Sequence, residues 1–543
     1  MSLSRPRLLI PLVLSFILAT CASGCEPLHR DIDSLDATDT GPDTSPSDAG
    51  TGVDDIFAHD ADTNLIAPDT ASADTDDSDS PPLCSIDNGG CGNPVHFECL
   101  EGDDSGLDCQ PLDLCATDNG GCGDERFAEC TDGLGQDPSC VAIKYHPTTT
   151  EDSWGTSQEC SLRAAIESIN NSEPVDGCHQ GQVDTIVLSS GQTYNLDRSG
   201  PDGVDNGSAD LWIDSAITIT SDGEAPAVID AGEASRALYI SKNGLLTIDG
   251  VLITGGVADP GNGGAILNRG TLHIHHSKIS NNRANGSDGQ LEGGGFGGGI
   301  YNEGHLTMVH AILEQNIARG GRGQDQLSGQ ASAGGGGAGL GGGVFNSGTL
   351  DLTATVFSDN QAIGGRGGNP TSCSSNPSGT AGNGGGHGGD GGSGSGDDGG
   401  PGDFGGGGGG GTGNNPATSP GAGGDGGFGG GGGGAGPHRF GDDHLAGGDG
   451  GFGAGDGGVA IDSCPAAGGG GAGIGGAIFH KGIELHVDDA SHFASNIVTE
   501  GQGGDPYHPG SQGQDGQGIA PHVFHFDGAV DCVSDCSDIV FEH

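Results

Sequence analysis

Apolar and polar residues alternate in short stretches that recur through the second half of the chain. The clearest pairs are Leu246/Ile248, Leu272/Ile274, Leu306/Met308 and Leu350/Leu352. A period of two residues is typical of a strand with one buried face. A glycine pair and an asparagine flank the later stretches, in the copies Gly263–Ile266…Asn282, Gly297–Ile300…Asn316, Gly341–Val344…Asn360 and Gly475–Ile478…Asn496. Because each unit is too small to bury its own apolar face, the pattern predicts stacked repeats.

The repeats align position by position, although their spacing is unequal. Ile240, Gly244, Leu246, Ile248 and Ile253 match Ile266, Gly270, Leu272, Ile274 and Ile279 at a shift of 26 residues, and later copies follow at shifts of 34 and 44. This predicts an all-β coil of parallel strands about 4.8 Å apart. A glycine at one corner of each repeat is expected to need a positive φ: Gly270, Gly304, Gly348 and Gly482. In the last copy Glu484 replaces the expected leucine, so we expect a bulge or a one-residue shift there.

Two columns of asparagine emerge from the alignment. One contains Asn268, Asn302 and Asn346, with His480 in the fourth place, and the other contains Asn282, Asn316, Asn360 and Asn496. Stacked amides can hydrogen-bond along the axis of such a coil and satisfy turn backbone. We therefore expect structural ladders; a catalytic or ligand-binding role is the alternative.

The connection after the second asparagine grows from repeat to repeat. The longest insert, residues 364–473, has 52 glycines among 110 residues. Because every insert enters at the same place, all should project from one edge, which in repeat proteins is often the binding face. Either a flexible coil or a closely packed polyglycine bundle fits this composition. A disulfide between Cys373 and Cys464 would hold the two ends of the insert together.

The start of the repeat region resembles a known family. Cys160–Ile166 opens an amphipathic stretch, Cys178 follows, and residues 184–188 and 191–196 are predicted strands. This resembles the N-terminal cap of bacterial parallel β-helix surface proteins that begin with Cys-Ser-Leu-Arg-Glu-Ala-Ile, although Ala164 stands where that family has glutamate. A helix there would cover the open end of the coil, and a Cys160–Cys178 disulfide would staple it.

The repeats themselves resemble those of polymorphic outer-membrane proteins, which carry a Gly-Gly-Ala-Ile phrase followed by Phe-x-x-Asn. Phe357–Asn360 and Phe493–Asn496 match the second phrase. The two resemblances imply a right-handed, pectin-lyase-like parallel β-helix over residues 150–530, with an N-terminal helical cap and a C-terminal tail at 531–543. They also imply a cell-surface protein of a kind implicated in adhesion.

The N-terminus has the pattern of an export signal. Arg5 and Arg7 precede an apolar run over residues 8–18, and Ala22–Cys25 resembles the lipobox of bacterial lipoproteins. The resemblance implies a signal peptide at residues 1–24 and a lipidated Cys25, and Glu26 after it favours the outer membrane. An ordinary secretory signal is the alternative. Residues 25–83 are predicted to be a disordered acidic tether, because they cannot bury enough apolar surface to fold.

Residues 84–109 and 115–140 form a duplicated cysteine module. Cys84, Cys91, Cys99 and Cys109 match Cys115, Cys122, Cys130 and Cys140 at a shift of 31 residues. Each copy contains Asn-Gly-Gly-Cys, which resembles an epidermal-growth-factor-like module with four cysteines instead of six. The resemblance implies first-to-third and second-to-fourth disulfides, while the residues alone leave three connectivities open. It makes calcium near Asp113 conceivable; a disulfide-stapled spacer without cofactor is the preferred interpretation. Cys532 and Cys536 could close a terminal loop.

The net charge and the candidate catalytic and metal-binding residues restrict the classes of function that the chain could have. The formal net charge of −58 argues against nucleic acid and anionic lipid surfaces as partners. Gly386–Gly388 matches a polygalacturonase phrase, and His273, His275 and His276 could hold a metal weakly, but solvent-facing histidine explains them as well. We expect a non-enzymatic, lipid-anchored outer-membrane protein whose partner is an unknown surface glycan or protein. A polysaccharide lyase or glycoside hydrolase, a structural coat component and a secreted protein are the alternatives.

Overall fold

The computed structural model describes residues 97–101, 107–112, 128–131, 134, 139–155, 158–178, 184–198, 209–289, 293–373, 379–414, 419–438, 444–533 and 537–541. Every described residue lies within Ser80–His543, the second of the two units into which the chain divides. The predicted signal peptide, Cys25 and the acidic tether therefore lie outside the described residues. Within the described residues, no helix is both long enough and apolar enough to cross a membrane.

Each four-cysteine module contains one antiparallel hairpin. In the first, β1 (Phe97–Glu101) pairs with β2 (Leu107–Pro111), and in the second β3 (Ala128–Thr131) pairs with β4 (Ser139–Ala142). The backbones of Cys99 and Cys109 are register partners, and Cys130 and Cys140 are partners in the same way. Cys109 is disulfide-bonded. The predicted connectivity of the modules otherwise falls on side chains outside the described residues.

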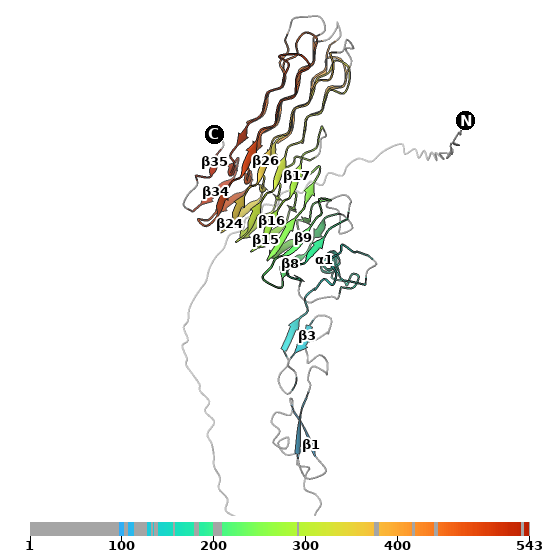
Figure 1. Cartoon of the computed structure of the whole chain (residues 1–543), viewed down its shortest axis with the longest axis vertical. Coiled ribbons are helices and arrows are strands. Elements are labelled where there is room, and N and C mark those ends of the chain that lie inside the picture. Colours follow the sequence, from blue (N-terminus) through green and yellow to red (C-terminus); the bar gives the residue numbers. More distant parts are fainter. Residues whose placement is uncertain are drawn as a thin grey trace, which may run out of the picture. The chain divides into compact units, whose positions relative to one another are not determined.

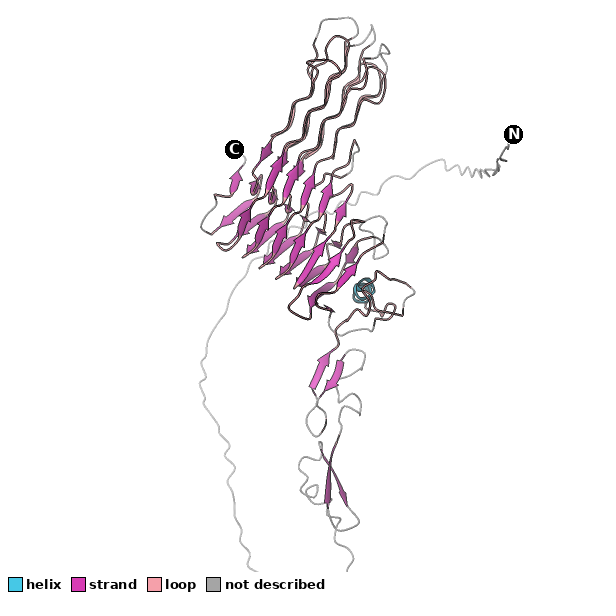
Figure 2. Cartoon of the chain, viewed as in Figure 1, coloured by secondary structure: helices cyan, strands magenta, loops and turns pink. Residues whose placement is uncertain are grey.

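The rest of the described chain is a parallel β-helix with very few helical residues (Figures 1 and 2). Its first sheet contains, in chain order, β5 (Thr185–Leu188), β8 (Ala216–Ser221), β11 (Leu245–Asp249), β15 (Thr271–His275), β19 (His305–Val309), β24 (Thr349–Thr353), β29 (Glu484–Val487) and β34 (Ala529–Cys532). The second contains β6 (Thr193–Asn195), β9 (Ala227–Asp230), β12 (Val251–Thr254), β16 (Lys278–Ser280), β20 (Ile312–Glu314), β25 (Val356–Ser358) and β30 (His492–Ala494).

Three further parallel sheets complete the coil. The third contains β13 (Val257–Ala258), β17 (Arg283–Asn285), β21 (Ile317–Arg319), β26 (Gln361–Ile363) and β31 (Ile497–Thr499). The fourth contains β7 (Leu211–Ile213), β10 (Leu238–Ile240), β14 (Ile266–Asn268), β18 (Ile300–Asn302), β23 (Val344–Asn346), β28 (Ile478–His480), β33 (Val523–His525) and β35 (Ile539–Phe541). The fifth contains only β22 (Gly339–Leu340), β27 (Gly473–Ile474) and β32 (Gly518–Ile519).

The predicted stacking of the apolar positions is confirmed in the first two sheets. Leu246, Leu272, Leu306 and Leu350 are successive register partners, and all are fully buried in one core. The predicted match of Ile240 with Ile266 is wrong, because Ile240 pairs with Asn268 and Leu238 pairs with Ile266. Three residues separate Ile240 from Gly244, whereas only Arg269 separates Asn268 from Gly270. The corner between Ile240 and Gly244 is therefore two residues longer than the next one. As a result, β10 pairs with β14 at a shift of 28 residues and not 26.

The corner glycines are explained by close approach and not by positive φ. The expectation of positive φ is wrong for Gly270, Gly304, Gly348 and Gly482, none of which adopts it. A Cβ atom at Gly304 would lie 2.0 Å from the carbonyl oxygen of Gly270, on the preceding turn of the coil. The positive φ angles occur instead at the first glycine of the repeated pair, where Gly263, Gly297, Gly341 and Gly475 have φ of 67°, 65°, 66° and 66°. Only glycine adopts this conformation without a steric cost.

The irregular last copy contains one extra residue, as expected from Glu484. Thr349 pairs with Glu484 and Leu350 pairs with Leu485, so Ile483 is inserted between the corner glycine and the strand. Ile483 is 71% exposed, which shows that the corner expels the added side chain into solvent. The strand register after it is therefore kept.

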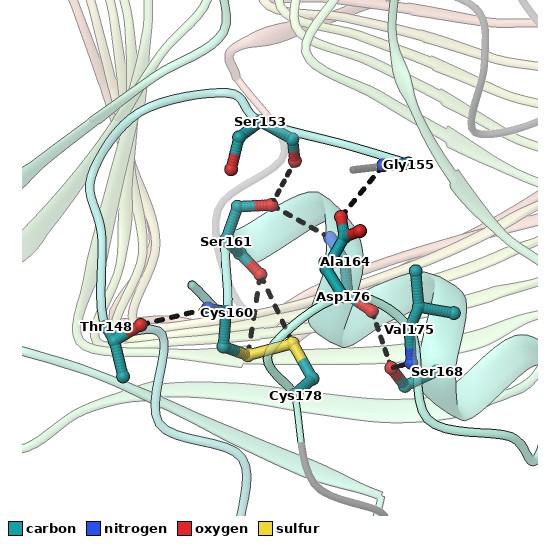
Figure 3. Close-up of a disulfide and its surroundings, with 10 residues drawn as sticks. All are labelled: Thr148, Ser153, Gly155, Cys160, Ser161, Ala164, Ser168, Val175, Asp176 and Cys178. Carbon is teal, nitrogen blue, oxygen red and sulfur yellow. Dashed lines mark hydrogen bonds between the residues drawn. A yellow bond between two sulfur atoms is a disulfide. The ribbon is translucent and has the colours of Figure 1, made fainter. Parts of the chain in front are cut away.

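The helix α1 (Leu162–Asn171) packs against β7 and β5, the first strands of two sheets. The Ser161 hydroxyl caps it by accepting a hydrogen bond from the Ala164 amide (Figure 3). Arg163, at the position next to the replaced glutamate, is buried and forms an ion pair of 2.6 Å with Asp152. A disulfide joins Cys160 to Cys178 (Figure 3), which ties the residues before the helix to the loop after it.

Candidate functional site

All the long inserts leave the coil at one edge. They follow β17, β21, β26 and β31, which are neighbours in one sheet. The chain then returns to the fourth sheet, through the Gly-Gly corner after β17, β21 and β26. In Figure 1 the segments on the side of β17 and β26 extend away from the strands and run beside one another. We call the described residues within 286–299, 320–338, 364–472 and 500–517 the glycine wing. The common exit point is the one expected from the sequence.

The glycine wing is a packed bundle and not a flexible coil. Its backbone hydrogen bonds advance in steps of three residues: the amides of Gly421, Gly424 and Gly427 donate to the carbonyls of Thr412, Gly409 and Gly406, each over 2.8 Å. The segment around Gly408 also accepts from residues 332–338 and donates to residues 428–434, again at every third residue. A three-residue period is that of the polyproline II helix, which has no internal hydrogen bonds and leaves its backbone groups free for neighbouring chains.

Close packing explains why the wing needs glycine. A Cβ atom added at Gly409, Gly433 or Gly457 would lie 1.9 to 2.1 Å from the carbonyl oxygen of the adjacent segment. Most of these glycines are buried, so their amides must be paired within the protein. The backbone amides and carbonyls of the bundle thus form hydrogen bonds with one another. In a flexible coil of the same composition they would form them with water.

An internal repeat of 24 residues organises the longest insert. Phe404, Phe428 and Phe452 stack on one another with ring centroids 5.1 and 5.2 Å apart, and each is followed by a glycine with positive φ. Each phenylalanine thus marks a hairpin turn at the base of the wing. These rings pack against a second aromatic column on the fourth sheet, which contains Phe345, Phe479 and Phe524. Together they form a second hydrophobic core, which fastens the wing to the coil.

A disulfide joins Cys373 to Cys464, at positions 91 residues apart in the sequence. It links the outgoing part of the longest insert to its returning part. Cys532 is disulfide-bonded as well, and Cys536 lies outside the described residues.

A cleft lined by arginine lies where the wing leaves the coil. Its volume is about 710 Å³, and its lining includes Arg283, Arg319, Arg322 and Arg366 together with Asp259 and Asp288. The chain has only 17 lysines and arginines, and four of them are gathered here. Arg322 and Arg366 form ion pairs with Asp325 and Asp505. Sequence reasoning missed this cleft, although the 44-residue shift that aligns the repeats also aligns Arg322 with Arg366.

Both asparagine columns are hydrogen-bonded ladders. The Asn268 amide donates to Asn302 over 2.7 Å and the Asn302 amide to Asn346 over 2.6 Å, and Asn346 contacts the His480 ring at 2.8 Å. In the other column Asn282, Asn316, Asn360 and Asn496 are linked in the same way over 2.9 to 3.0 Å. All are buried, and their amides also bond to backbone carbonyls, so the side chains serve the corners of the coil.

Burial lowers the pKa of His480, the histidine in the first ladder. His480 is fully buried, and desolvation together with the neighbouring His525 ring lowers its pKa to about 4. The rings of His480 and His525 stack with centroids 5.3 Å apart. His480 is therefore neutral at physiological pH. A neutral ring has a nitrogen that can accept a hydrogen bond from the Asn346 amide.

Of the histidines proposed for weak metal binding, His273 and His275 lie on the outer face of the first sheet and His276 lies in the turn after β15. His273 and His275 are stacked with ring centroids 6.4 Å apart, and His276 contacts Asp249 at 3.1 Å. Desolvation, His305 and His275 lower the pKa of His273. No cluster of three or more potential metal ligands occurs among the residues described. His387, from the polygalacturonase-like phrase, lies in the wing beside Phe296, with ring centroids 6.3 Å apart.

Comparisons of the chain with protein-family models, curated protein sequences and solved structures find no match. We call the glycine wing together with the arginine-lined cleft at its base the loop-bearing edge.

Proposed function

We propose that the chain is a non-enzymatic cell-surface protein that uses its β-helix as a stiff rod to display the loop-bearing edge for adhesion or envelope interaction. The observation that carries this proposal is the exit of every long insert from one edge, combined with the packing of those inserts into a wing. An ordered wing presents a fixed surface to a partner, and a pre-ordered surface loses less conformational entropy on binding.

The N-terminal part of the proposal rests on the sequence. Lipidation of Cys25 would anchor the chain in the outer membrane, and residues 25–83 would hold the folded part away from it. We further propose that the coil is right-handed and pectin-lyase-like, and that α1 caps its open end. The partner is a surface glycan or protein, and neither the display role nor the fold of the wing needs a cofactor.

A glycan array and a cell-attachment assay on the full-length chain would test the proposal. We expect attachment to a glycan or cell surface without chemical change of the ligand. Release of unsaturated or reducing sugar ends from a polysaccharide would contradict it and favour the lyase or hydrolase alternative. Altered envelope integrity with unchanged attachment on deletion of the protein would favour a structural coat component.

A further inference from the structure

The arginines of the cleft come from successive turns of the coil, which the repeat stacks on one another. Arg283 begins β17 and Arg319 ends β21, on the next turn of the coil, and Arg319 is the register partner of Asn285 and Ile363. Arg322 and Arg366 follow on successive turns, and the Gly323 amide donates to the Arg366 carbonyl over 2.9 Å. Stacked turns of a parallel coil are about 4.8 Å apart. Three successive turns therefore supply guanidinium groups to one cleft.

These guanidinium groups have hydrogen-bonding capacity that the described chain does not use. The Nε atoms of Arg283, Arg322 and Arg366 are buried and have no hydrogen-bond partner among the described residues. In the same part of the chain, the Arg283 and Arg319 side chains form no ion pair. A buried donor without an acceptor is costly. A carboxylate or sulfate group in the cleft can bind the two terminal nitrogens of a guanidinium group with two parallel hydrogen bonds.

The charge of the whole chain restricts what this cleft can hold. A net charge of −58 repels dense polyanions at long range, whereas contacts within the cleft are short and screened less. A volume of about 710 Å³ lies within the usual range for a small-ligand site. A short ligand that carries carboxylate or sulfate groups on a polar frame meets both conditions.

We propose that the arginine-lined cleft binds short acidic oligosaccharides through the carboxylate or sulfate groups of their sugars. Arg283 and Arg319 bind the oxyanions directly, because neither forms an ion pair with an acid among the described residues, although Asp259 and Asp288 line the same cleft. Arg322 and Arg366 are held by Asp325 and Asp505 and form the wall of the cleft. The cleft inference rests on the proposed surface role, since it names the class of glycan that the loop-bearing edge would recognise.

Calorimetric titration of the full-length chain in detergent would test the cleft. The probes are hexagalacturonate, its methyl-esterified form, a sulfated hexasaccharide and hexathymidylate. We expect binding of one or both acidic hexasaccharides, weakening with added salt, and no binding of the neutral ester. The Arg283→Gln/Arg319→Gln double variant should bind about tenfold more weakly or worse, since a charged hydrogen bond contributes about 1.5–3 kcal/mol. The carboxylated and sulfated probes distinguish the two sources of oxyanion.

The matched control is Arg269→Gln, because Arg269 lies outside the cleft and is paired with Glu303. It should bind as the wild type does. The inference would be overturned if neither acidic hexasaccharide bound, if the double variant bound as tightly as the wild type, or if hexathymidylate bound more tightly than the hexasaccharides. Attachment to cells, measured on the same variants, separates the two proposals. Sugar binding by a chain that attaches to no surface would leave the cleft intact and refute the display role.

Discussion

The Asn302 side-chain amide donates a hydrogen bond of 2.6 Å to the side-chain oxygen of Asn346, one turn further along the coil. The same Asn302 nitrogen lies 2.9 Å from the carbonyl oxygen of Thr349, where the next strand begins. One side chain therefore connects two turns and satisfies a corner carbonyl. Repetition of this contact fixes the corner from which each turn passes into the first sheet.

Replacement of Asn302 by alanine should destabilise the coil by about 1–3 kcal/mol, because it leaves buried polar groups on both neighbouring turns without partners. Thermal and denaturant unfolding of the full-length chain would measure the change. Asn243→Ala is the matched control, since Asn243 is exposed at another corner. Equal stability of the two variants would show that the ladder contributes nothing.

The wing should not tolerate a methyl group at its packed positions. Gly433→Ala places a Cβ atom 1.9 Å from the Gly409 carbonyl oxygen, so we expect a loss of about 1–3 kcal/mol and faster amide exchange within the wing. Gly394→Ala is the control, because its nearest atoms belong to the exposed and rotatable Asp397 side chain. Similar hydrogen-exchange profiles for both variants would argue against close packing.

The Cys373–Cys464 disulfide should stabilise the wing by restricting the unfolded chain. Closing a loop of 91 residues contributes about 2–4 kcal/mol in typical cases. The double variant Cys373→Ser/Cys464→Ser should therefore unfold at a lower temperature and be cleaved sooner by protease within residues 364–473. Cleavage at the wild-type rate would show that the bridge is dispensable.

Stability should fall in mild acid because of His480. Its pKa is lowered from the ordinary value of 6.5 to about 4, so between these values the unfolded chain binds a proton that the folded chain does not. The contribution is fully present above about pH 6.5 and is lost as the pH falls toward 4, by at most about 3 kcal/mol. Unfolding curves of His480→Asn should depend less on pH in this range. His310→Asn, at an exposed position, should behave as the wild type.

The sequence predicted the coil well because its signal is local and repeated. The Leu-x-Leu strands, both asparagine ladders and the common exit of the inserts follow from residues at fixed places in each copy. The role of Gly270 was misjudged, because close approach to the Gly244 carbonyl depends on the neighbouring turn and leaves no mark in local sequence. The fold of the wing was left open, since glycine composition alone does not distinguish coil from bundle. The 24-residue spacing of Phe404, Phe428 and Phe452 was the signal that could have decided it.

The arginine-lined cleft could not be found from any one segment. Arg283 and Arg319 come from different turns, and inserts of unequal length separate Arg283 from the pair Arg319/Arg322 and that pair from Arg366. Only after the turns are stacked do these side chains lie around one space.

Surface attachment of the full-length chain, compared between two sets of variants, tests the central claim that the loop-bearing edge is the binding face. One set carries Arg283→Gln/Arg319→Gln at the base of the wing, and the other carries Thr247→Gln/Lys278→Gln on the strand faces of the first and second sheets. We predict that attachment to cells or glycan-coated surfaces falls at least about tenfold in the first set and is unchanged in the second. Loss of attachment in the second set alone, or no attachment by the wild-type chain, would contradict the account.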